Sequence, residues 1–240
     1  MNKAVIKSII VTFLFLLVIS IGGAISSIAG INSKITLFIA YLILFVILVI
    51  WINRKKYWDY YGFSTGKIKD KRNIYIYIPL FLIALLPLIV GFSTDLKIGD
   101  IIYILFFMAL VAFVEETIFR GIILKLLQKK SNLFAILGTS LLFSIPHILN
   151  ALNGKEISQT ILQISFALVI GIILAILIIK TNSIITVIIY HFINNTITSV
   201  TSSNVDASMS LYLNLAVFLI ALIYMIYLYS LIIPKNSRSE

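Results

Sequence analysis

Five ionisable side chains lie in parts of the sequence that are otherwise apolar enough to cross a membrane. Glu115, Glu116 and Arg120 stand within the run AFVEETIFRGI, and His147 and His191 stand in two later apolar runs. A charged side chain at the centre of a membrane helix costs about 2.5–3.5 kcal/mol on insertion scales, so such residues usually face a bundle interior or a wet cavity. Because a carboxylate beside an imidazole can activate a water molecule, these residue types indicate hydrolysis.

Helical spacing gives the two glutamates different roles. Glu116 precedes Arg120 by four residues, which is the favourable orientation for an ion pair on one helix face. Glu115 points about 100° away around the same helix. We therefore expect Glu116 and Arg120 to form a structural pair and Glu115 to be the free carboxylate.

Other polar residues supply the further groups that peptide hydrolysis needs. His191 and Asn195 are four residues apart, and Phe143 and His147 repeat that spacing in another apolar run; in a helix, residues so spaced share a face. Glu115 and one histidine could activate a water molecule, while the other histidine and Asn195 stabilise a tetrahedral oxyanion. Phe143 is expected to pack beside the site.

A metal-dependent site is the alternative use of the same side chains. Glu115, His147 and His191 could hold Zn²⁺ and leave one position open for water. The helix signature HExxH of zinc proteases is absent from the sequence, so that pattern gives the metal no support. The cofactor stays open between zinc and none.

The composition indicates the kind of chain that must position these residues. Hydrophobic residues make up 61% of the sequence and charged residues 12%, and the mean hydropathy is +1.11. Soluble domains carry about 25% charged residues, so we expect a polytopic membrane protein. The sequence has no cysteine, which excludes disulfides, thiol nucleophiles and cysteine-based metal sites.

Apolar stretches of about the length that a membrane helix needs recur along the chain and predict an all-α bundle of about eight spans. The expected spans are 8–29, 35–53, 74–93, 101–124, 133–150, 159–179, 183–200 and 211–233. Lysine and arginine gather in alternate connections, which predicts that both termini are cytoplasmic. The net charge of +10 is then a feature of membrane topology, and no nucleic-acid partner is expected.

Other interpretations of these features have less support in the residues. The first segment, with its basic start and apolar centre, also resembles a signal peptide, but its length favours a retained helix. A diaspartyl protease needs two aspartates within the membrane, and none falls in a predicted span. Ser144 lies near His147 but lacks the GxSxG context of a serine nucleophile. A transporter with a Glu/His proton relay would be expected to show an inverted repeat, which the sequence does not display.

Three short motifs together resemble the CPBP family of intramembrane proteases, also called the Abi or CAAX-protease family. EETIFR carries Glu115, Glu116 and Arg120 as EExxxR, FSIPH runs from Phe143 to His147 as FxxxH, and HFINN runs from His191 to Asn195 as HxxxN. The motifs fall in a core at 100–200 within a single transmembrane domain, 1–240. The family includes type II CAAX prenyl endopeptidases and bacteriocin-processing or self-immunity proteins.

The resemblance implies an intramembrane endopeptidase and assigns roles to the residues. Glu115 with His147 would activate the water, and His191 with Asn195 would stabilise the oxyanion. The residues implied to organise or support the site are Glu116, Arg120 and Phe143. The expected substrate is a membrane-associated peptide or protein in a bacterial plasma membrane, such as a bacteriocin, a pheromone precursor or a CAAX-like tail. The alternative is a catalytically silent relative that gives bacteriocin self-immunity by binding a partner.

Depth in the membrane presents one difficulty for this assignment. Counted from the expected span ends at 1.5 Å per residue, His147 lies about 5 Å and Glu115 about 20 Å from the outer surface. Side chains that cooperate must meet at one depth. We therefore expect tilted helices, or a fifth span that begins deeper than residue 133.

Overall fold

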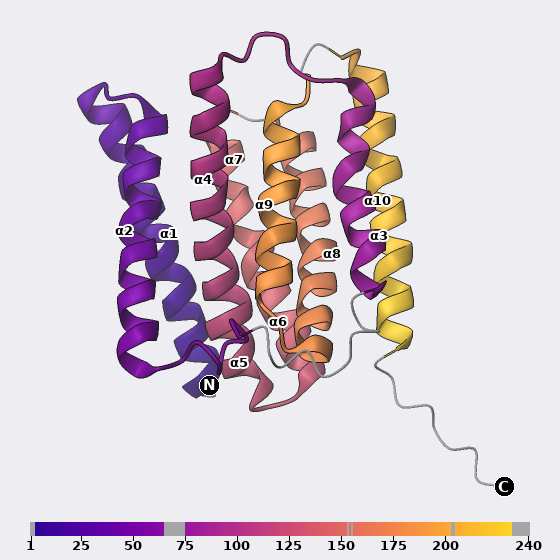
Figure 1. Cartoon of the computed structure of the whole chain (residues 1–240). Helices are drawn as coiled ribbons and strands as arrows, with labels where there is room; N and C mark the ends of the chain where they lie inside the picture. The colour runs from indigo at the N-terminus through magenta and orange to yellow at the C-terminus, as the bar shows by residue number, and fades with distance from the viewer. Residues whose placement is uncertain (1–2, 65–74, 153, 155, 203–204, 232–240) are drawn as a thin grey trace, which may run out of the picture.

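The computed structural model describes residues 3–64, 75–152, 154, 156–202 and 205–231, which form a bundle of helices (Figure 1). Its α-helices are α1 (Lys3–Ala29), α2 (Ser33–Lys55), α3 (Ile78–Leu85), α4 (Ile98–Glu116), α5 (Leu124–Gln128), α6 (Asn132–Ser144), α7 (Leu149–Leu152), α8 (Ile157–Thr181), α9 (Ile185–Val200) and α10 (Ala207–Ser230). Shorter turns of other helix types are the 3₁₀-helices η3 (Leu86–Val90) and η5 (Ile145–Ile148) and the π-helix η4 (Thr117–Ile123). No strand occurs in these ranges, and the predicted all-α class is confirmed.

Helical segments correspond to all the predicted spans, but they differ in length. Those long and apolar enough to cross a membrane are Lys3–Ala29, Ser33–Lys55, Ile98–Gln128, Ile157–Thr181 and Ser208–Ser230. The other predicted spans are the shorter apolar helices Tyr75–Val90, Asn132–Ile148 and Ile185–Val200. Because a full span needs about 20 residues, the ends of these shorter helices can lie within the membrane interior.

The helices pack around α8, which is the most enclosed of the long segments. Figure 1 shows α1 and α2 as a pair at one side, α4 and α9 in the middle, and α3 and α10 at the other side. α6 packs against α8 at Gly171, where an added Cβ would lie 3.0 Å from the Cβ of Ser140. A small residue at this position therefore allows the two helices to approach closely.

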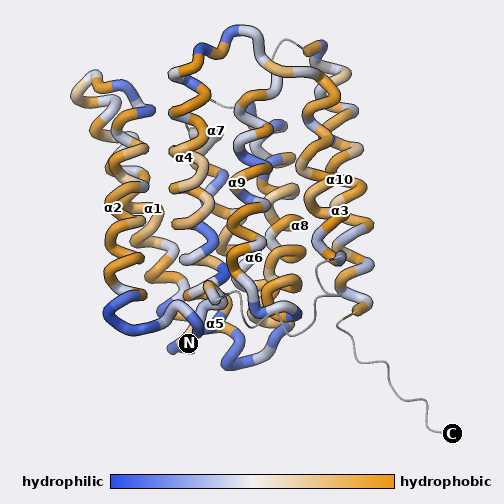
Figure 2. Tube along the Cα trace, in the orientation of Figure 1, coloured by the Kyte–Doolittle hydropathy of each residue, from blue (hydrophilic) through white to orange (hydrophobic). Residues whose placement is uncertain are grey.

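One end of the bundle is hydrophilic and collects basic residues. The start of α1 and the end of α10 both lie there (Figure 1), as predicted for termini on the same side. Figure 2 shows hydrophilic residues gathered at this end and apolar residues along the helices. Lys55 at the end of α2 and Lys129 directly after α5 are exposed, and the basic residues of the connections at 65–74 and 232–240 lie outside the described residues. The charge asymmetry predicts that this end is the cytoplasmic one.

The loop that follows α2 packs against other segments at this same end of the bundle. Gly62 has a φ of +82°, and its carbonyl accepts a hydrogen bond from the N–H of Ile184 over 3.0 Å. An added Cβ at Gly62 would lie 2.5 Å from the carbonyl oxygen of Asn182, so this contact requires glycine. Tyr61 packs against Gly121 in η4. The loop is thus packed against the helix that carries the two glutamates.

Candidate active site

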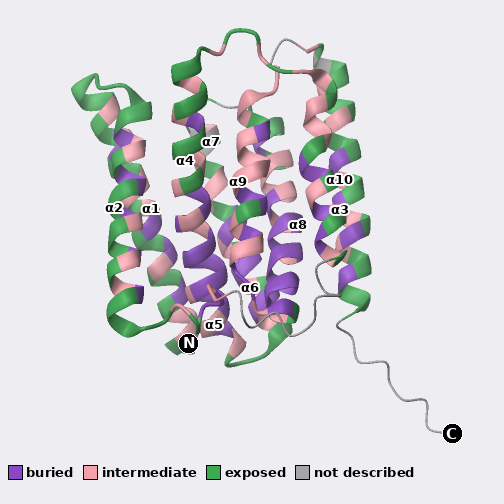
Figure 3. Cartoon of the chain, in the orientation of Figure 1, coloured by how far each residue is buried: buried purple, intermediate pink, exposed green. Residues whose placement is uncertain are grey.

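A buried ion pair stands where α4 passes into the π-helix η4. Arg120 Nη1 lies 3.3 Å from Glu116 Oε1, and both side chains are fully buried. Figure 3 shows that buried residues concentrate in this half of the bundle. The guanidinium also lies over the ring of Phe143, with Cζ 3.9 Å from the ring centroid. Arg120 is therefore held by a carboxylate and by a cation–π contact.

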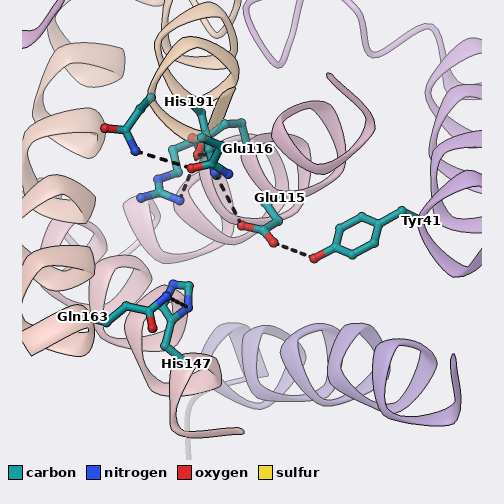
Figure 4. Close-up of polar contacts among 9 residues, drawn as sticks. Tyr41, Glu115, Glu116, His147, Gln163 and His191 are labelled. Atoms are coloured by element: carbon teal, nitrogen blue, oxygen red, sulfur yellow. Dashed lines mark hydrogen bonds and ion pairs between the residues drawn. The ribbon is translucent and has the colours of Figure 1, made fainter. Parts of the chain in front are cut away.

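His191 connects the two glutamates. Its Nδ1 donates a hydrogen bond to Glu116 Oε1 over 2.7 Å, and its Nε2 lies 3.8 Å from Glu115 Oε2. The first distance is a short charge-assisted hydrogen bond. The second is too long for a direct hydrogen bond. Glu116 therefore fixes the imidazole through one nitrogen and leaves the other facing Glu115 (Figure 4).

Glu115 is held from a helix that the sequence analysis did not connect with the site. The hydroxyl of Tyr41, in α2, donates a hydrogen bond to Glu115 Oε1 over 2.7 Å, and Figure 4 shows the tyrosine approaching from the side opposite His191. Tyr41 is buried, whereas the side chain of Glu115 keeps 13% exposure. The position of Tyr41 in the middle of an apolar span could have indicated such a contact, because a buried hydroxyl needs a hydrogen-bond partner.

Phe143 lies at the centre of these contacts. Its ring centroid is 5.8 Å from that of His147 and 6.0 Å from that of His191, both in edge-to-face geometry. It also contacts Phe119 edge-to-face at 5.3 Å. Both imidazoles therefore pack on one phenyl ring, and Phe143 brings the two histidines into the same region of the bundle.

The fifth predicted span, 133–150, is interrupted just before His147. The predicted span 133–150 is not one straight helix, because α6 ends at Ser144 and the 3₁₀-helix η5 follows with Pro146 in its first turn. Proline has no N–H to continue the α-helical hydrogen bonds. The whole apolar segment Asn132–Ile148 is also short. His147 therefore does not sit at the outer end of a full-length span.

His147 is bonded to a side chain of α8. Gln163 Nε2 lies 3.4 Å from His147 Nδ1, and Figure 4 shows this pair apart from the group formed by Glu115 and His191. The resemblance pairs Glu115 with His147 for water activation, whereas the imidazole that faces Glu115 in the structure is that of His191. Gln163, like Tyr41, was not anticipated from the sequence.

Asn195 follows His191 by one turn of α9. Its carbonyl accepts a hydrogen bond from Ser199 Oγ over 2.7 Å, and its side-chain Oδ1 accepts one from Asn194 Nδ2 over 3.4 Å. All three polar side chains are only partly buried. They form a polar stripe on α9 that continues from His191 toward the outer end of the bundle.

The side chains do not form an evident metal centre. Within the part of the chain that the structure describes, no group of three His, Cys, Asp or Glu residues is arranged to hold a metal ion. Of the set considered for zinc, Glu115 and His191 approach each other, but His147 is turned to Gln163.

Part of the chain matches a known protein family. Residues 97–197 match the family model described as type II CAAX prenyl endopeptidase Rce1-like. The matched segment begins beside α4 and ends within α9, so it contains all the motif residues and leaves out α1, α2, α3 and α10. No curated protein matches the chain.

Proposed function

We propose, from the match of residues 97–197 to the Rce1-like family of type II CAAX prenyl endopeptidases, that the chain hydrolyses peptide bonds within the membrane. The predicted resemblance to the CPBP intramembrane proteases is confirmed by this match. The observation that carries the proposal is the placement of two adjacent carboxylates on either side of one buried imidazole. Glu116 orients His191, and Glu115 faces the nitrogen that remains.

Glu115 is the general base of the proposed reaction. It is the less buried of the two carboxylates, and it is not paired with Arg120, which bonds Glu116. Glu115 takes a proton from a water molecule as the water oxygen attacks the carbonyl carbon of the scissile bond. In the second step the same proton passes to the leaving nitrogen as the C–N bond breaks.

His191 and Asn195 stabilise the negative charge that develops on the carbonyl oxygen. In the protonated imidazolium of His191, Nδ1–H donates to the Glu116 carboxylate and Nε2–H is left to donate to the carbonyl oxygen. Asn195 adds a carboxamide donor one turn away on the same helix. A donor fixed in a low-dielectric site is worth about 100- to 1,000-fold in rate when it points at an oxyanion. His147 contacts the same Phe143 ring and is held by Gln163.

The substrate is a membrane-associated peptide or protein. The matched family is named for prenylated CAAX tails, and such a tail is the first candidate for this chain. Bacteriocin and pheromone precursors of a bacterial plasma membrane are the others. In each case the peptide to be cleaved would lie in the same bilayer as the apolar helices of this protein.

The experiment is cleavage by the full chain reconstituted in nanodiscs. The probes are quenched fluorescent peptides, one with a farnesylated CAAX tail and one with an unmodified apolar span. Wild type is compared with Glu115→Gln and with Glu156→Gln, which changes an exposed carboxylate before α8. We expect Glu115→Gln to lose cleavage by at least 100-fold and Glu156→Gln to retain it.

Retained cleavage in Glu115→Gln would contradict the proposed reaction. The protein would be the catalytically silent relative if it cleaves neither probe and if cells carrying wild type and cells carrying Glu115→Gln contain the same membrane peptides. Such a protein would protect against a bacteriocin equally well with either residue at position 115.

A further inference from the structure

The two carboxylate oxygens of Glu115 face different partners, Tyr41 and His191. Oε1 accepts the tyrosine hydroxyl over 2.7 Å, and Oε2 faces His191 Nε2 at 3.8 Å. The terminal torsion of a glutamate is broad, so an unheld carboxylate rotates freely. With Oε1 engaged, the second oxygen is the one presented to the imidazole and to a water molecule between them.

The position of Tyr41 is itself fixed by two neighbouring helices. Its ring contacts Phe15 of α1 edge-to-face at 6.2 Å and Phe107 of α4 edge-to-face at 5.5 Å. Phe15 also contacts Phe119 in η4, at 5.7 Å. The phenol therefore has a packed, defined orientation, and its hydroxyl is aimed at the carboxylate.

Tyr41 lies outside the segment that matches the protease family. The match begins at residue 97, whereas Tyr41 is in α2, and the helix is otherwise almost entirely apolar from Ile35 to Ile52. A hydroxyl in such a helix carries a desolvation cost unless it is bonded. The bond to Glu115 offsets that cost and connects the N-terminal helix pair to the chemistry.

A purely structural clamp between α2 and α4 is the rival explanation. The same pair of helices is joined nearer its outer end, where the Tyr103 hydroxyl donates to the carbonyl of Lys34 over 2.9 Å and Lys34 Nζ lies 3.1 Å from Asp100. Tyr103 also stacks on Phe107 at 5.4 Å. Tyr103 is thus a matched tyrosine in the same helix contact with no link to the carboxylate.

We propose that Tyr41 is a positioning residue for Glu115, and that α2 completes a site whose motifs all lie in residues 97–197. This inference rests on the proposed peptidase function. Tyr41→Phe keeps the ring and removes only the hydroxyl. Loss of a hydrogen bond to a charged group, at about 1.5–3 kcal/mol, corresponds to a fall in kcat of about ten- to a hundred-fold.

The test uses the full chain in nanodiscs and two readouts. With the quenched peptide that wild type cleaves, Tyr41→Phe should lower kcat and leave KM within two-fold, while Tyr103→Phe changes neither. Dicyclohexylcarbodiimide, an apolar reagent for intramembrane carboxyl groups, should modify Glu115 several-fold faster in Tyr41→Phe, because Oε1 is no longer engaged. Mass spectrometry of the Glu115 peptide measures that rate without any substrate.

The outcomes separate this inference from the proposed function. If Glu115→Gln abolishes cleavage but Tyr41→Phe changes neither kcat nor the labelling rate, positioning by Tyr41 is wrong and the peptidase stands. Equal losses in Tyr41→Phe and Tyr103→Phe would show a clamp between helices and would also overturn it. If cleavage continues in Glu115→Gln, the proposed function is wrong, and faster labelling of Glu115 in Tyr41→Phe would still establish the contact.

Discussion

Replacing Arg120 by methionine should destabilise the protein severely, because it leaves the carboxylate of Glu116 buried without its cation. Both side chains are fully buried and 3.3 Å apart, and the guanidinium also covers Phe143. Breaking a buried pair by removing one partner costs about 3–5 kcal/mol. At about 2–4 °C per kcal/mol for a chain of this size, the midpoint of thermal unfolding should fall by roughly 6–20 °C.

The fluorescence of the two tryptophans follows this unfolding. Trp51 stacks on Tyr61 at 5.9 Å, and Trp58 contacts Phe63 at 5.0 Å, so both report the closed inner end of the bundle. Purified wild type, Arg120→Met and Arg120→Lys are heated in the same detergent. The lysine variant keeps the charge but loses the planar contact, and it should fall between the other two.

A double variant separates the stability of the pair from its part in the reaction. Glu116→Leu combined with Arg120→Met replaces the pair by apolar side chains, which is often neutral or stabilising. We expect the stability of the double variant to return toward that of wild type and its cleavage to be lost, because His191 no longer has an acceptor for Nδ1. A wild-type unfolding midpoint in Arg120→Met would refute the buried pair, and an active double variant would refute the role of Glu116.

Three further changes test other parts of the structure. Gln163→Leu removes the side chain bonded to His147 and should lower kcat about ten-fold at unchanged stability. One hydrogen bond of about 1.4 kcal/mol corresponds to that factor of ten. An unchanged kcat would contradict a supporting role for Gln163. Gly62→Ala places a Cβ 2.5 Å from a backbone carbonyl at a φ of +82° and should lower the free energy of unfolding by about 1–3 kcal/mol, measured by the same tryptophan fluorescence. Because the chain has no cysteine, single cysteines introduced as Lys55→Cys and Lys97→Cys can be labelled with an impermeant maleimide. Only Lys97→Cys should react in intact cells. The reverse pattern would show that the topology is opposite to the predicted one.

The membrane architecture could be predicted closely from the sequence because it depends on local quantities. Apolar length and basic loops place the helices, and the long spans Lys3–Ala29 and Ile157–Thr181 differ from the predicted 8–29 and 159–179 only by a few residues at their ends. The pairing of Glu116 with Arg120 is equally local, since both lie on one helix face. Such features need no knowledge of the neighbouring helices.

Contacts between distant helices could not be obtained in this way. Tyr41 and Glu115 are 74 residues apart, and Gln163 reaches His147 from another helix. The change to a π-helix after Glu116 could not be predicted, because the residues from Thr117 to Ile123 show no sequence pattern that indicates it. Periodicity identifies which side chains face inward, but the partner that each one meets depends on how the helices pack.

The most direct measurement of the central claim is the cleavage rate of Glu115→Gln, His191→Ala and the double variant, on one peptide probe in nanodiscs. If the carboxylate and the imidazole act on one water molecule and one carbonyl, each single change should lower kcat by about 100- to 10,000-fold, and the double variant should be no slower than the worse single one. Independent losses that multiply, or a single variant that cleaves at the wild-type rate, would contradict the account.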